Sequence, residues 1–375
     1  MAPLVSFIAV AVAPALTQIA AELGGGGDGV LVAQLVMTVP SIFIIVGAAM
    51  SGYIAERIGR RALALICLLA YSLSGVAGFF VEGLEALVAS RIVLGFAGGM
   101  MLTTGYATVG EYFEGSRREW MLGCVSACGS FSSVVLLWFG GDFVERFGWH
   151  APFAVYALGM AVLPFAWFGM HRGLPPKSTG EVSSWRPIVR LWPLYLLVTV
   201  YTIGMYMPTI QAPFLLAERG ETGPALVGKI ISVSSLVAAI GALLYGPMRR
   251  WLNFNATFVC ISAVLGIGML MVVASGTPTM FVVACAVMGL GLGIIEPAIA
   301  SEALGRTPEI LHDRAVGISL AALFFGQFLN PLVAKPLRDA GGAGFTFTVI
   351  GSAFLLAAAL FLIAALRPRQ AQPAP

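Results

Sequence analysis

Three ionisable residues stand inside or at the end of long apolar stretches: Glu296, Arg91 and Glu111. Glu296 lies in "LGIIEPAIA", and the following Pro297 has no N–H, so a helix passing through it leaves one carbonyl unpaired. Loss of water disfavours the charged form of a carboxyl group, which suits a Glu296 that binds a proton or a cation. The alternatives are a structural carboxylate paired between helices and one that lies close to lipid headgroups.

The other two residues belong to one apolar stretch. Arg91 lies near the start of that stretch, where its long side chain can also snorkel to the surface. Glu111 lies at its other end, and a loop-facing pair with Arg117 or Arg118 is the alternative to a coupling role.

The sequence lacks the arrangements typical of an enzyme. Its three histidines stand far apart in loops, and no nucleophile with a neighbouring base, zinc motif or G-x-x-x-x-G-K-[ST] loop occurs. We therefore predict no catalytic residue, no metal, no cofactor and no nucleotide-driven step. The cysteines all fall in apolar stretches, and we interpret them as packed, inert thiols: Cys67, Cys124, Cys128, Cys260 and Cys285.

The composition identifies the solvent of these stretches. Hydrophobic residues make up 59% of the chain, charged residues make up 10%, and the mean hydropathy is +0.92. Soluble domains contain about 45–50% apolar and about 25% charged residues, so this chain is far outside that class. The lipid bilayer is the expected partner, and the scattered basic residues with a net charge of +3 give no support for nucleic-acid binding.

Runs of about 20 mostly apolar residues are long enough to cross roughly 30 Å of hydrocarbon. Counting such runs gives twelve: 3–22, 30–52, 62–81, 86–109, 120–140, 149–170, 191–213, 225–247, 255–275, 279–301, 314–336 and 345–366. We predict an all-α membrane protein with twelve transmembrane helices. A six-helix bundle over 1–170 is followed by a linker over 171–190, a second bundle over 191–366 and a tail over 367–375.

The loops predict the orientation. Most Lys and Arg residues fall in loops on the side of the two termini, which predicts cytoplasmic termini and a cytoplasmic linker in the plasma (inner) membrane. The N-terminus lacks the basic start and the cleavage site of a signal peptide, so we interpret it as a retained helix. A start codon upstream of Met1 stays open.

The two predicted bundles resemble each other in sequence. A glycine-rich helix runs through a charged loop to an arginine in both, and Gly95 to Arg118 spans 23 positions, as does Gly291 to Arg314. A duplicated six-helix unit accounts for this spacing, and chance similarity between apolar helices is the alternative.

A charge cluster, "GYIAERIGRR", lies between the second and third predicted spans. Topogenic charge explains its arginines but not the order of glycine, acid and arginine. That order resembles the loop 2–3 signature of the major facilitator superfamily, written G-x-x-x-D-R-x-G-R-R, with Glu in place of Asp. "RIVLGFAGG", with Arg91, Gly95, Gly98 and Gly99, is similar to the fourth-span signature of that family. The matching residues of the cluster are Gly52, Glu56, Arg57, Gly59, Arg60 and Arg61.

The resemblance implies roles for several residues. In this family the loop 2–3 acid and arginines lock the inner ends of the two halves together in the outward-open state, which implies such a lock here for Glu56 and Arg60, with Arg118 as a partner. It links the arginine at Arg91 to proton coupling or substrate contact. Spans one, four, seven and ten line the central cavity in this fold, and helix packing is the alternative role for their side chains. The candidates are Gln18, Met101, Thr104, Tyr201, Met205, Gln211 and Glu296.

These residues predict a monomeric secondary transporter that works by alternating access. We expect proton-coupled efflux of a small amphiphilic organic compound, with proton-coupled uptake of a small metabolite as the alternative and a transporter-like sensor as a weaker one. The Gly-Pro pair associated with antiporters is missing from span five, which weakens the efflux interpretation. Span one has no acidic residue before Glu22 at its last position, so proton coupling depends largely on Glu296. Gln327 and Asn330 are predicted to bond between helices.

Overall fold

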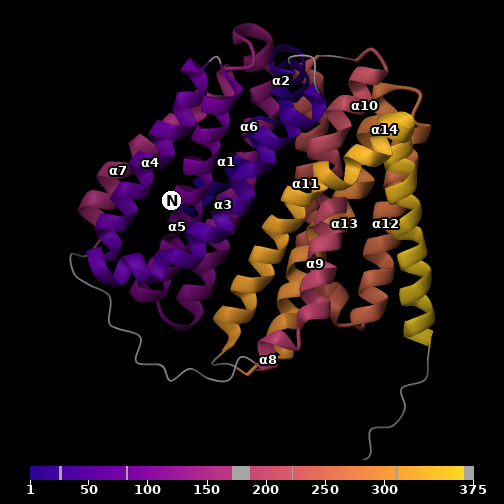
Figure 1. The fold of residues 1–375 in the computed structure, drawn as a ribbon. Helices are drawn as coiled ribbons and strands as arrows, with labels where there is room; N and C mark the ends of the chain where they lie inside the picture. Colours follow the sequence, from indigo (N-terminus) through magenta and orange to yellow (C-terminus); the bar gives the residue numbers. More distant parts are fainter. Residues whose placement is uncertain (25–27, 82, 171–185, 222, 309–310, 367–375) are drawn as a thin grey trace, which may run out of the picture.

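The computed structural model describes residues 1–24, 28–81, 83–170, 186–221, 223–308 and 311–366, which are almost entirely helical (Figure 1). The linker and tail predicted over 171–190 and 367–375 lie largely outside the described residues. The chain forms two bundles, coloured indigo to magenta and pink to yellow in Figure 1, which are closest at the end that carries α2 and α10.

The first bundle begins with a broken span and continues with long helices. Pro14 lies in a short 3-10 turn, because a proline inside a helix removes a backbone bond and clashes with the preceding turn. Gly59 has a φ of +84°, a conformation that favours glycine, and this residue separates α3 from α4. The elements are α1 Ala2–Val10, η1 Ala13–Ala15, α2 Leu16–Leu23, α3 Gly29–Ile58, α4 Arg60–Phe80, α5 Leu84–Tyr112, α6 Gly115–Phe147, η2 Ala151–Ala157 and α7 Leu158–Gly169.

The second bundle also begins with a broken span, in which the π-helical turn η3 carries Pro208. Its elements are α8 Arg186–Val189, α9 Trp192–Met205, η3 Met207–Gln211, α10 Ala212–Glu218, α11 Pro224–Arg249, α12 Phe254–Ala274, α13 Pro278–Gly305 and α14 His312–Leu366.

The predicted fold class is confirmed. Eleven of the described helical stretches are long and apolar enough to cross a membrane, and α14 counts as one of them. Its 55 residues would extend about 80 Å as one straight helix, far more than a bilayer core of about 30 Å. Non-helical backbone at Gly341 and Gly342 divides α14 into two spans, which gives the twelve predicted crossings.

The internal repeat is visible in how the helices touch. In the first half, α3 and α5 meet where a Cβ on Gly95 would lie 2.3 Å from the Pro40 carbonyl oxygen. In the second half, α11 and α13 meet where a Cβ on Gly289 would lie 2.5 Å from the Ser234 carbonyl oxygen. The two residues of the second contact lie 194 positions after those of the first. Two further pairs of contacts have the same offset: Gly99 with Ile44 corresponds to Gly293 with Ala238, and Gly47 with Phe96 corresponds to Gly241 with Leu290.

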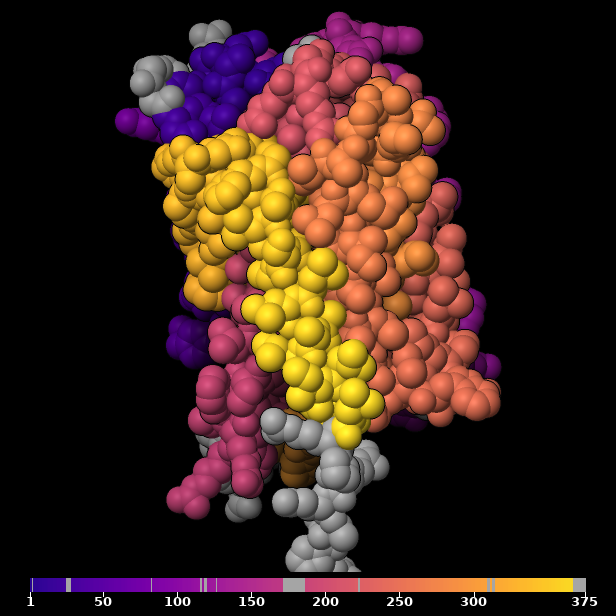
Figure 2. All heavy atoms as spheres, turned by 90° about the vertical axis from the view of Figure 1, so that its right-hand side faces the viewer, coloured from indigo at the N-terminus to yellow at the C-terminus, as the bar shows by residue number. Residues whose placement is uncertain are grey.

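The outer surface is apolar, as expected for a lipid-facing protein. Figure 2 shows the end of α14, in yellow, running alongside α12, in orange. Large hydrophobic side chains on these two helices are exposed, and on a water-soluble protein such a surface would be an association site. They include Ile267, Leu356, Leu360, Leu362, Ile363 and Leu366.

Candidate functional site

A cavity of about 400 Å³ lies between the two bundles. Its wall comes from α1, α5 and α6 of the first bundle and from α9, η3, α11, α13 and α14 of the second. Both halves therefore build the site, and any change in how they are placed relative to each other changes the shape of the cavity.

Glu296 is the only Asp, Glu, Lys or Arg side chain among the described residues that line this cavity. Pro297 follows it within α13, which continues to Gly305. Because Pro297 has no N–H, the carbonyl of Gly293 loses its helical partner, and Gly293 lines the cavity too. No ion pair or hydrogen bond to Glu296 is found in the described part of the chain. An unpaired acid thus faces a mostly apolar cavity.

Hydroxyl groups accompany Glu296, and none of them belongs to the seven cavity candidates named from the sequence. Tyr206 and Thr209, one helical turn apart on span seven, line the cavity together with Glu296. The other polar lining residues are Ser6, Tyr106, Ser130, Ser133, Ser234 and Ser235. Helical spacing between Ser130 and Ser133, three residues apart, was the available signal that these side chains share one face.

Two of the seven residues predicted for the cavity line it, namely Met205 and Glu296. The Tyr201 hydroxyl bonds to Ser262, and its ring packs against Phe258 and Phe354 inside the second bundle. Four other predicted residues lie away from the cavity wall: Met101 and Thr104 are buried against neighbouring helices, Gln211 is buried in a hydrogen-bond chain, and Gln18 is half-buried.

Ion pairs join the two halves at the end that carries Asp28 and Arg338, which we call the closed end. Asp28 Oδ2 lies 2.6 Å from Lys335 Nζ and 3.4 Å from Arg338 Nη2. Burial raises the pKa of Asp28, but the hydrogen bonds from Lys335 and from Leu31 N, with the charges of Arg338 and Lys335, outweigh it. The pKa of Asp28 therefore lies below its ordinary value of 3.8.

Helices α6 and α11 form a second contact at the closed end. Asp142 Oδ1 lies 3.3 Å from Lys229 Nζ, and the Ala225 N–H donates to Glu145 Oε1 at 3.1 Å. Backbones approach closely here, because a Cβ on Gly228 would lie 2.4 Å from the Leu137 carbonyl oxygen. The closed end is thus held by backbone contact as well as by charge.

A chain of buried amides lies between the Asp28 ion pairs and span seven. Arg338 Nη1 donates to Gln34 Oε1 at 3.1 Å, and Gln34 Nε2 donates to Gln211 Oε1 at 2.8 Å. Gln211 Nε2 donates to Asn330 Oδ1 at 2.8 Å, and Asn330 Nδ2 donates to the Ile203 carbonyl at 2.8 Å. We call Gln34, Gln211 and Asn330 the amide chain. All three are almost completely buried, and the Gln34–Gln211 bond joins the two halves.

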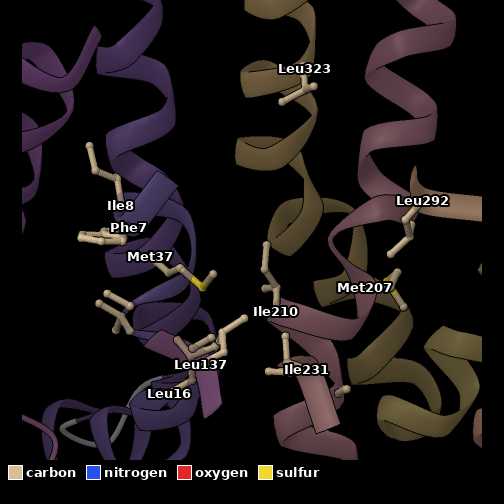
Figure 3. Packing of buried hydrophobic residues seen from close by; sticks show 14 of the residues in the cluster. Phe7, Ile8, Leu16, Met37, Leu137, Met207, Ile210, Ile231, Leu292 and Leu323 are labelled. Atoms are coloured by element: carbon tan, nitrogen blue, oxygen red, sulfur yellow. The ribbon is translucent and has the colours of Figure 1, made fainter. Parts of the chain in front are cut away.

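Apolar side chains seal the same region. In Figure 3 Ile210 lies between Met37 and Leu137 of the first bundle and Ile231 of the second. All four side chains are buried, with at most 1% of their surface exposed. These four side chains form an apolar plug between the bundles, and the amide chain passes beside it through the neighbouring Gln211.

The charge cluster between α3 and α4 lies at the opposite end. Arg60 Nη1 lies 2.7 Å from Glu111 Oε1, whereas the sequence had offered a pair of Glu111 with Arg117 or Arg118 as the alternative to a coupling role. Glu56 is exposed and makes no ion pair with the described residues. The side chain of Arg118 lies outside the described part of the structure.

The remaining members of the cluster have local contacts. Arg57 donates to the Tyr53 hydroxyl, and the Arg61 guanidinium lies 4.6 Å from the centre of the Trp167 ring. The positive φ of Gly59 explains its glycine, whereas no atom comes within 4 Å of a Cβ placed on Gly52. The structure thus gives no steric reason for Gly52.

Arg91 is 1% exposed and neither lines the cavity nor reaches the surface. Its Nη2 donates to the carbonyls of Ser74 and Gly75 at 3.1 and 3.0 Å. Its guanidinium lies over Phe153 and Tyr156, with 4.7 and 5.3 Å to the ring centres. Arg91 therefore ties α5 to α4 and η2 inside the first bundle.

Comparison with known proteins supports a transporter. A model described as Major Facilitator Superfamily matches residues 2–331. The chain is 28% identical over 175 residues to the multidrug efflux pump Tap of Mycolicibacterium fortuitum. The aligned region covers 46% of this chain and 42% of that pump. It is 24% identical over 330 residues to the class C tetracycline resistance protein of Escherichia coli, covering 84% and 81% of the two chains.

Solved structures and a further relative widen this set. The chain is 22% identical over 354 residues to a probable nitrate/nitrite transporter, NarK2, of Mycobacterium tuberculosis, covering 88% and 84% of the two chains. The crystal structure of a D-xylose-proton symporter matches with a TM-score of 0.79 at 12% identity, over 96% of this chain and 94% of that one. A POT family transporter in complex with 5-aminolevulinic acid matches with a TM-score of 0.76 at 14% identity, over 96% and 94%.

Proposed function

The chain belongs to the Major Facilitator Superfamily, and we propose that it is a secondary active transporter that exports a small amphiphilic organic compound in exchange for protons. Alternating access requires a site between two halves that is reached from one side at a time. The cavity between the bundles, closed at one end by ion pairs and an apolar plug, supports this mechanism.

The observation that carries proton coupling is the environment of Glu296. It is the one charged side chain in the described cavity lining, and no basic group neutralises it there. A carboxylate in a membrane-spanning segment costs at least about 2.5–3.5 kcal/mol, so binding of a proton or of a cationic group stabilises it. Loss of the proton to one side and uptake from the other then drives the cycle.

The size and lining of the cavity support the substrate class. About 400 Å³ accommodates a small organic molecule, and methionine, aliphatic and aromatic side chains with scattered hydroxyls suit an amphiphilic one. The efflux pumps among the relatives favour export. Uptake of a small metabolite is the second candidate, because a nitrate/nitrite transporter is also similar to this chain.

The orientation belongs to the same proposal. With cytoplasmic termini in the inner membrane, the closed end faces outward, and the structure corresponds to an inward-facing state. In that state the inner ends of the halves are apart, so a lock formed by Glu56, Arg60 and Arg118 is released. The ionic contact of Arg60 with Glu111, inside one bundle, agrees with this interpretation.

Substitution of Glu296 tests the proposal in proteoliposomes with an imposed pH gradient. Ethidium serves as the transported probe, and a pH-sensitive dye reports proton flux. We expect Glu296→Gln to abolish proton flux coupled to ethidium while the protein still elutes as a folded monomer. Glu302→Gln is the matched control, because Glu302 lies on the same helix but pairs with Arg306 outside the cavity. Unaltered coupled flux in Glu296→Gln would remove Glu296 from the mechanism.

Direction is measured in cells. Accumulation of ethidium that rises when an uncoupler collapses the proton gradient indicates export, and accumulation that falls indicates uptake. A thiol reagent that does not cross membranes, applied to cysteines placed at Arg117 and Glu221, measures which end faces the outside.

A further inference from the structure

The amide chain ends on the part of span seven that forms a wall of the cavity. Asn330 Nδ2 donates to the Ile203 carbonyl, two residues before Met205, and Gln211 is the last residue of the π-helical turn η3. Between these two attachment points lie Met205, Tyr206 and Thr209, which line the cavity. The amide chain that joins the two halves therefore also bonds to this wall at both ends of the wall.

This wall segment lacks part of its own helical hydrogen bonding. Pro208 has no N–H, so the Gly204 carbonyl loses its helical partner and the turn widens to the π form. Single π turns are rare and occur mostly at functional sites. Gln211 and Asn330 are buried. If their hydrogen bonds were lost, their two side-chain amides and the Ile203 carbonyl would be left without partners.

We propose that Gln34, Gln211 and Asn330 are positioning residues that link the state of the closed end to the shape of the cavity wall at Met205, Tyr206 and Thr209. The Gln34–Gln211 bond exists only while the two halves touch at the closed end. When they separate, Gln211 Oε1 no longer accepts from Gln34 Nε2, η3 is freed at one end, and Tyr206 and Thr209 move relative to Glu296. This inference rests on the proposed alternating access, because it needs the closed end to open.

The test separates local coupling from opening of the whole molecule. Cysteines at Asp142 and Lys229, whose native side chains lie 3.3 Å apart, are joined by a short bifunctional thiol reagent to keep the closed end shut. A further cysteine at Thr209 reports the wall, and one at Ser130, on the opposite wall, is the control. The partly exposed Cys124, Cys128 and Cys260 are replaced by alanine in this background.

The variants Gln34→Met and Gln211→Met keep the volume of the side chain and remove the amide. Hydrogen bonds between helices in membranes are worth about 0.6–1.7 kcal/mol, which corresponds to about 3-fold to 20-fold in an equilibrium. In cross-linked protein we expect each variant to change the rate of maleimide labelling at Thr209→Cys by a factor in this range. Labelling at Ser130→Cys should stay within about twofold. Both variants break the Gln34–Gln211 bond, so the double variant should change the rate by less than the product of the two single changes.

Two results would overturn the proposal. One is an unchanged rate at Thr209→Cys in cross-linked Gln34→Met that elutes as folded protein, and the other is an equal change at Thr209→Cys and Ser130→Cys. Asn330→Leu acts on the far end of the chain and keeps the test available if Gln34→Met does not fold. The proposed function is tested separately: ethidium transport that persists after cross-linking would contradict alternating access and leave the labelling result intact.

Discussion

Arg60 of the loop between α3 and α4 pairs with Glu111 at the end of α5, with 2.7 Å between Arg60 Nη1 and Glu111 Oε1. Both residues belong to the first bundle, and the Ala107 carbonyl accepts a weaker bond from the same Nη1 at 3.4 Å. In this state the arginine is therefore held inside its own half. A lock between the halves requires Arg60 to exchange this partner for one across the interface.

Loss of Glu111 should favour that exchange. Glu111→Gln removes the charge that holds Arg60, and a partly exposed pair of this kind is worth up to about 1 kcal/mol, or about fivefold in population. We expect the distance between nitroxide labels at Arg117 and Arg249 to shift toward shorter values as the inner ends close. Glu85→Gln, an exposed acid at the other end, should leave the distance distribution unchanged. A distribution for Glu111→Gln identical to that of the parent would contradict the exchange.

The Asp28 ion pairs predict the opposite shift at the closed end. Asp28→Asn keeps the cap on α3, because asparagine accepts from the Leu31 N–H as well as aspartate does, but removes the charge facing Lys335 and Arg338. We expect labels at Arg146 and Glu221 to report a larger open population. Asp339→Asn is the matched control, since Asp339 pairs with the same lysine within α14 and joins no halves. An equal effect of both substitutions would argue against a role for Asp28 between the bundles.

The same residue fixes a pH dependence. The pKa of Asp28 is lowered in this state, so its ion pairs stabilise the closed end at every pH above its ordinary value of 3.8 and weaken as pH falls below it. Between pH 5 and 8 the label distances at the closed end should therefore not respond through Asp28. Below about pH 4 the open population at the closed end should rise in the parent. It should change less in Asp28→Asn, in which it is already larger. A response centred near neutral pH at the closed end would point to another group.

The paired glycine contacts predict a difference between glycines. Gly293→Ala places a Cβ 1.8 Å from the Ala238 carbonyl oxygen, and Gly99→Ala places one 2.1 Å from that of Ile44. Such overpacking costs about 1–3 kcal/mol or more, so both variants should unfold at lower temperature in detergent. Gly246→Ala meets no atom within 4 Å and should leave stability equal or raise it by up to about 1 kcal/mol. Equal melting temperatures for all three would refute the steric argument.

Hydropathy was sufficient to predict the fold, because the bilayer imposes a length and a composition on every span. The one visible difference in span count, the fusion of the last two spans into α14, comes from a backbone that turns only at Gly341 and Gly342. The repeat was also visible, but the sequence comparison used a shift of 196 positions. The contacts between helices, in which glycines approach carbonyl oxygens, give an offset of 194 instead. The sequence comparison ran through the charged loops and did not include these contacts.

The cavity was harder to predict, because the sequence does not give the rotation of a helix about its own axis. Tyr201 and Met205 lie four residues apart on span seven, yet Tyr201 faces the core of its own bundle and Met205 faces the cavity. The π turn that follows changes the phase again and directs Gln211 toward Gln34. Contacts such as Arg60 with Glu111 depend on which conformation the two halves adopt.

The 194-position correspondence also relates Leu102 to Glu296, and both line the cavity. The helix contacts of the two halves correspond, whereas the side chains at this matched pair of positions are an apolar leucine and an acid. Among the described lining residues the acid lies on one wall alone, so the two halves present unequal chemistry to whatever enters between them.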